Sequence, residues 1–139
     1  MRRKITITAH WLSFVFLVLL IAGGPIGLLG WSFALSGLVM CAPALISGVM
    51  NGPGPKLRGP LRAAHPWLSR AMYLALGAIA ALTLWHLLRG TWPGGTLPNL
   101  YFYLLMVSAL HAVFHLWRHT ALGDGALRRI TPKSMHNIL

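Results

Sequence analysis

Residues 5–23 read ITITAHWLSFVFLVLLIAG, an apolar run interrupted by one ionisable side chain, His10. A helix of about 20 apolar residues spans the ~30 Å hydrocarbon core of a bilayer. Three further stretches qualify, at about 31–50, 67–88 and 98–117, and together the four fill more than half of the 139 residues. We therefore predict an all-α protein, a single four-helix transmembrane domain over residues 1–139.

Basic residues precede the first run, as they do in a signal peptide. The run is longer than the apolar core of a typical signal peptide, so we expect a retained helix. Of the twelve lysines and arginines, eleven flank the termini or the second connection, and only Arg89 belongs to the other side. Positive residues remain in the cytoplasm, which predicts that the N- and C-termini are cytoplasmic. The same rule explains the basic charge, so no nucleic acid is expected as a partner.

Composition excludes several kinds of site. Charged residues make up 9% of the chain, and Asp124 is the only acidic one, against ~25% charged residues in soluble domains. Catalysis by paired carboxylates is therefore not expected. A single cysteine, Cys41, excludes an internal disulfide and the Cys-x-x-Cys-His attachment of a c-type haem. Seven histidines remain as candidate site residues.

Two histidines fall at matching depth in different predicted helices. His10 lies about 8 Å inside the cytoplasmic end of the first helix, and His111 about 9 Å inside that of the fourth, at ~1.5 Å per residue. Such a pair suits axial ligation of a haem iron within a bundle. Depth alone does not separate His111 from His115, one turn away. Hydrogen bonding of these imidazoles to helix carbonyls is the alternative, and His65 is expected in the second loop, near the surface.

Several segments resemble the bacterial cytochrome b561 family. The opening Ile7-Thr8-Ala9-His10-Trp11-Leu12 is similar to that family's first helix. Leu110-His111-Ala112, followed by His119, Asp124, Leu127, Arg129 and Pro132, resembles its last helix and tail, and Ala64-His65 with Tyr73 resembles the entry to its third helix. The resemblance implies a multi-pass protein of the bacterial inner (cytoplasmic) membrane.

That family binds two b-type haems and exchanges electrons with quinone. The resemblance implies that His10 and His111 hold the iron of one haem b near the cytoplasmic side. It places Phe33 and Leu97, which cannot ligate iron, where the ligands of the outer haem would stand. His115, Lys4 and Arg129 are further candidates for the haem surroundings, although basic residues also contact lipid phosphates.

These observations predict a membrane electron-transfer protein with one haem, working with quinone or a partner redox protein, and not a self-contained enzyme. The alternative is a haem-free, cytochrome b561-like accessory subunit of a larger membrane complex. For that alternative, a face of small residues on the second helix offers a contact for a partner subunit or a second copy in a homodimer: Gly37, Cys41, Ala44 and Gly48. Simple packing within the bundle also explains this face.

Overall fold

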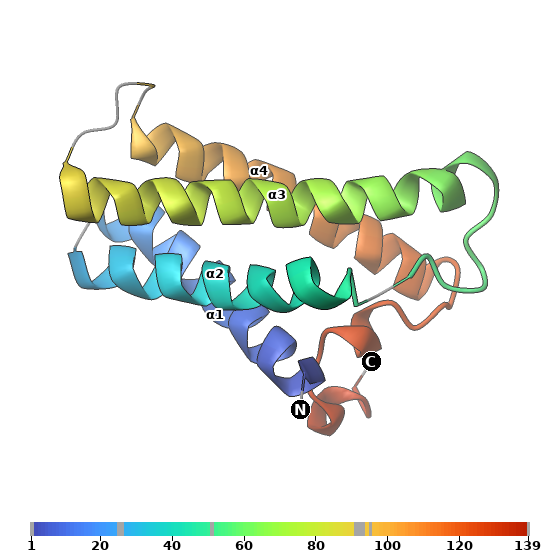
Figure 1. Cartoon of the computed structure of the whole chain (residues 1–139). Coiled ribbons are helices and arrows are strands. Elements are labelled where there is room, and N and C mark those ends of the chain that lie inside the picture. Colours follow the sequence, from blue (N-terminus) through green and yellow to red (C-terminus); the bar gives the residue numbers. More distant parts are fainter. Residues whose placement is uncertain (1, 25–26, 51, 91–93, 95, 139) are drawn as a thin grey trace.

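Four long helices make up most of the computed structural model, which describes residues 2–24, 27–50, 52–90, 94 and 96–138. They are α1 (Arg2–Gly23), α2 (Gly27–Ser47), α3 (Gly59–Arg89) and α4 (Leu97–Thr120). Two short 3-10 helices follow, η1 (Leu127–Arg129) and η2 (Lys133–Met135). No strand occurs among the described residues, so the predicted all-α four-helix class is confirmed (Figure 1).

The helices run up and down, so that both termini and the α2–α3 connection lie at one end of the bundle (Figure 1). We call this the termini end and the opposite one the far end. All four helices are long and apolar enough to cross a membrane. Large apolar side chains cover their outer surfaces, and Leu45 and Ile46 are 85% and 83% exposed. The chain is therefore a multi-pass membrane protein, whose outward apolar side chains face lipid.

α3 begins eight residues earlier than the predicted residue 67, and this changes the position of His65. Its first residue is Gly59, and Pro60 occupies the first turn. Proline is favoured there because its missing N–H is one that the helix does not use and because its φ is already helical. The expectation of a loop around His65 is therefore wrong: His65 lies inside α3 and is 2% exposed.

α2 and α3 pack closely through small side chains. A Cβ atom added at Gly37 would lie 2.9 Å from the Cβ of Ala80, and one added at Gly77 would lie 3.3 Å from the Cys41 sulfur. Cys41 also donates its S–H to the Tyr73 carbonyl, 3.4 Å away. Small residues allow two helices in a membrane to approach until their backbones are close. At Gly37 and Cys41 the small-residue face of α2 is therefore covered by α3 of the same chain.

Replacing Gly37 by alanine should destabilise the bundle. The new methyl group meets the Ala80 Cβ, which has no flexible atoms to move aside, and such overpacking costs about 1–3 kcal/mol. We expect a lower melting temperature in detergent. Gly27→Ala is the control, because nothing lies within 4 Å of that position and Gly27 is the first residue of α2, so the added methyl group meets no neighbour. Equal melting temperatures for the two variants would contradict the close contact.

The far half of the bundle is filled by side chains. Phe33 of α2 is fully buried and packs edge-on against Tyr101 of α4, with ring centroids 5.6 Å apart. The Tyr101 hydroxyl is 3.0 Å from the hydroxyl of Thr83 on α3, so a hydrogen bond joins α3 to α4. Leu20 and Leu97 are buried in the same core. This half therefore has a dense interior contributed by all four helices.

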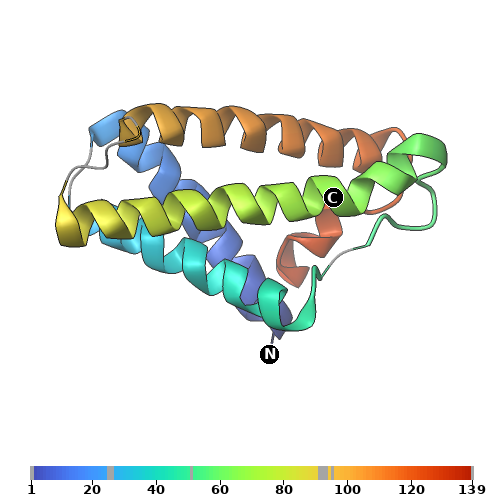
Figure 2. The ribbon, with the colours of Figure 1, turned by 45° about the horizontal axis from the view of Figure 1, so that its top comes forward.

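Toward the termini end, α1 and α4 move apart (Figure 2). The segment that contains η1 and η2 lies in the space between them (Figure 2). The bundle is therefore packed at the far end and opened at the termini end, and the opened half contains the candidate site.

Candidate functional site: a histidine-lined cavity

A cavity of about 530 Å³ occupies the opened half. Its walls come from the first half of α1, from α3, from the second half of α4 and from the C-terminal segment, with a contribution from α2 and the residues after it. Its volume is in the range of ligand pockets, about 300–1,000 Å³. Apolar side chains make up most of the lining, and no Lys, Arg, Asp or Glu is among the described residues that form it.

Four histidines line this cavity: His10, His65, His111 and His115. His10 comes from α1 and His111 from α4, so the two predicted ligands share one space. The rings of His111 and His115, one turn apart on α4, have centroids separated by 4.4 Å and are tilted by 57° to each other. The ring of His65 is 6.2 Å from that of His115 and nearly perpendicular to it. The cavity therefore has an imidazole on α1 and a row of three across α3 and α4.

Two of these imidazoles have nitrogen atoms without hydrogen-bond partners. Both ring nitrogens of His65, and Nδ1 of His115, are buried and make no hydrogen bond with any described residue. Buried polar atoms are paired in the great majority of cases because an unpaired one costs free energy. Such atoms on the wall of a cavity are available to pair with a ligand or with ordered water.

The C-terminal segment closes one side of the cavity. Leu127, Ile130, Thr131 and Met135 are part of its lining. The indole N–H of Trp11 on α1 donates to the Ile130 carbonyl at 3.0 Å. Arg3 donates to the Arg128 carbonyl at 2.9 Å. These two bonds fasten the segment to the start of α1.

Trp11→Phe should loosen this closing segment. The variant keeps an aromatic ring but loses the bond to Ile130, and one such bond is worth about 0.5–1.5 kcal/mol. We expect trypsin to cut after Arg128 and Arg129 about two- to tenfold faster. The measurement is limited proteolysis in detergent followed by mass spectrometry. Trp67→Phe is the control, because Trp67 is exposed and stacks on Arg70. An unchanged cleavage rate for Trp11→Phe would contradict the role given to this bond.

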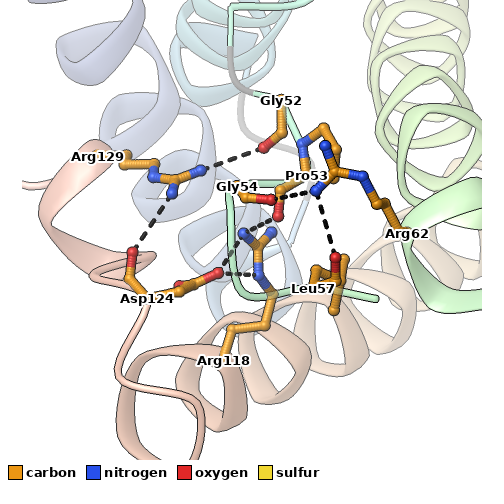
Figure 3. A network of polar contacts seen from close by, with 8 residues as sticks. All are labelled: Gly52, Pro53, Gly54, Leu57, Arg62, Arg118, Asp124 and Arg129. Carbon is orange, nitrogen blue, oxygen red and sulfur yellow. Dashed lines mark hydrogen bonds and ion pairs between the residues drawn. The ribbon is translucent and has the colours of Figure 1, made fainter. Parts of the chain in front are cut away.

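A buried ion pair holds the same segment to α4 (Figure 3). The Arg118 Nε donates to Oδ2 of Asp124 at 2.8 Å, and both side chains are almost completely buried. Arg118 also donates through Nη2 to the Pro53 carbonyl at 2.6 Å. The end of α4, the connection before α3 and the C-terminal segment therefore meet at one guanidinium group.

Lys4 and Arg129, the two basic residues predicted for the haem surroundings, do not line the cavity. Arg129 donates to the carbonyls of Gly52 and Asp124 at 3.2 and 3.3 Å (Figure 3). Lys4 lies on α1 and is exposed. Gly54, at φ +77°, passes so close that a Cβ there would be 2.7 Å from the Arg129 guanidinium. Arg129 thus joins two loops through hydrogen bonds to their carbonyls. Of the three residues predicted for the haem surroundings, only His115 lies on the cavity wall.

Asp124→Asn should destabilise the termini end strongly. Breaking a buried pair leaves the Arg118 charge uncompensated, which costs about 3–5 kcal/mol. The expected result is a marked fall in the melting temperature in detergent. The double variant Arg118→Met/Asp124→Leu should recover much of the loss, because a buried pair can be exchanged for apolar residues at little cost. Lys133→Ala, at an exposed position, is the neutral control, and an equally small effect of Asp124→Asn would argue against the pair.

Phe33 and Leu97 lie in the dense core of the far half. The space around them is filled by Tyr101 and its neighbours. The sequence prediction placed these two residues where the ligands of an outer haem would stand, and in the structure they supply packing side chains there.

No group of three or more His, Cys, Asp or Glu side chains arranged to hold a metal ion occurs in the described part of the chain. Haem needs fewer protein ligands, because the porphyrin supplies the others. Comparison with protein-family models, with curated proteins and with solved structures found no match. The resemblance to cytochrome b561 therefore remains a prediction that rests on the residues quoted above.

Proposed function

We propose that this chain is a membrane electron-transfer protein similar to b-type cytochromes, with one haem b in the histidine-lined cavity. The observation that carries the proposal is the meeting of His10 and His111 in an apolar cavity of about 530 Å³. Neutral imidazole is a common ligand of haem iron. The nitrogens of His65 and His115 that lack hydrogen-bond partners also support the proposal, because they are polar atoms that a bound ligand can pair with.

In this proposal His10 and His111 would hold the haem iron, and they come from the two helices that separate toward the termini end. Haem, when bound, supplies an iron centre that accepts and releases one electron. The apolar lining excludes water, and the C-terminal segment covers one side of the site. His115, adjacent to His111, belongs to the haem surroundings and not to the ligand pair.

The packed far half limits the path of the electron. With Phe33, Tyr101 and Thr83 filling that half, a single haem would exchange electrons on the termini side alone. The basic residues at that end favour a cytoplasmic location for it by the positive-inside rule, and the family resemblance favours a bacterial inner membrane. Quinone in the bilayer or a partner redox protein would then be the donor and acceptor, and the chain is not a self-contained enzyme.

The proposal is tested by the dithionite-reduced minus oxidised spectrum of the detergent-purified protein. We expect one b-type haem per chain with a low-spin bis-histidine spectrum. His10→Ala and His111→Ala should each abolish it, because each removes an axial ligand. His86→Ala is the matched control, since His86 lies near the far end of α3 and is not among the cavity's lining residues.

A spectrum that survives both His10→Ala and His111→Ala would overturn the ligand assignment, and two haems per chain would contradict the packed far half. A colourless protein would contradict the proposal as a whole. If that colourless protein co-purifies with a stoichiometric partner, the accessory-subunit hypothesis takes its place. The small-residue face is covered by α3 at Gly37 and Cys41, whereas Ala44 is half-buried and Gly48, just after α2, is exposed, so only this end of the face remains for such a partner.

A further inference from the structure

His65 is a buried side chain that the proposed ligation does not use. It is 2% exposed, it lines the cavity, and neither ring nitrogen has a hydrogen-bond partner among the described residues. A neutral imidazole carries one N–H donor and one acceptor nitrogen. An arrangement that leaves both atoms unsatisfied in the protein alone calls for a ligand atom beside the ring.

His115 supplies a second unsatisfied nitrogen close to the first. Its Nδ1 is buried without a partner, and its ring is 6.2 Å from that of His65. His115 lies one helical turn nearer the termini end than His111, and His65 lies in the first two turns of α3, at the same end. The two rings therefore form a polar patch on the termini side of the ligand pair.

Three hydroxyl donors on the cavity wall are already occupied. The hydroxyls of Thr6, Ser13 and Thr131 donate to helix carbonyls at 3.1, 2.8 and 3.0 Å. No lysine or arginine is among the described lining residues. Arg118 and Arg129, the nearby buried and half-buried cations, are held by Asp124 and loop carbonyls. The hydroxyls of Ser69, Tyr73 and Ser108 line the cavity farther from the termini end than His65 and His115 do. At that end the two imidazoles are therefore the donors best placed to meet an acidic group.

We propose that His65 and His115 bind the carboxylate groups of the ligand, which for haem are its two propionates. This inference rests on the proposed function and assigns the orientation of the haem: its iron between His10 and His111, its carboxylates toward the termini end. The arginines around Asp124 add a positive field at that end, which favours negative groups there. In this proposal the carboxylates are bound by His65 and His115, and not by Lys4 or Arg129.

The test compares haem with haem dimethyl ester, which keeps the iron and the ring but lacks free carboxylates. Both are titrated into the full-length apoprotein in detergent, and binding is followed by absorbance. We expect the wild type to bind free-acid haem at least about tenfold more tightly, since hydrogen bonds to charged groups are the stronger ones. In His65→Leu and His115→Leu this preference should fall toward onefold, mainly through weaker binding of the free acid.

His65→Gln is the rescue variant, because its amide N–H₂ restores a donor and should retain part of the preference. His86→Leu is the control and should behave as the wild type. The wild-type comparison of the two haems needs no variant, so it remains decisive even if a leucine variant does not fold. Equal affinities in the wild type, with a spectrum that depends on His10 and His111, would overturn this inference and leave the proposed function standing. Absence of binding by either haem would instead overturn the proposed function.

Discussion

One ion pair organises the termini end of the bundle. Asp124 is the only acidic side chain in the chain, and it lies buried against Arg118 at the last turn of α4. Two charges taken out of water are stable only when each has good partners. Arg118 also donates a hydrogen bond to the Pro53 carbonyl, and Arg129 joins the same corner to the Gly52 carbonyl (Figure 3). Through this corner the C-terminal segment is held where it can complete the cavity.

The two halves of the bundle are built by opposite means. In the far half the aromatic pair Phe33–Tyr101 fills the centre, and from the middle of α2 onward small residues let α3 approach closely. In the other half α1 and α4 separate, and side chains from the C-terminal segment line the space that results. Leu17, Leu76 and Leu104 belong to the buried core and also line the cavity, so the core directly forms one wall of the open half.

Much of this arrangement follows from the sequence. The four apolar stretches predict the four helices because a span must satisfy its backbone internally, and His10 and His111 were expected at matching depth from helix rise alone. The position of His65 was missed, since hydropathy places the start of α3 at the first long apolar run. The Gly59-Pro60 pair was the available signal, because proline in a first turn marks a helix start.

The closing segment could not be predicted from the apolar pattern. Residues 127–135 are too short and too polar to span a membrane, and their place is set by single bonds to distant residues, such as that from Trp11 to Ile130. Contacts of this kind, 119 positions apart in the chain, leave no periodic trace in a sequence. The four helices can be predicted from local sequence, whereas the closure of the cavity depends on contacts between residues that are far apart in the chain.

The order of the chain gives this enclosure a consequence for biosynthesis. Residues 127–135 emerge from the ribosome after all four helices have been made, so the bundle can enter the bilayer while its cavity still lacks one wall. The wall contributed by Leu127, Ile130, Thr131 and Met135 is therefore the last part of the cavity to be synthesised.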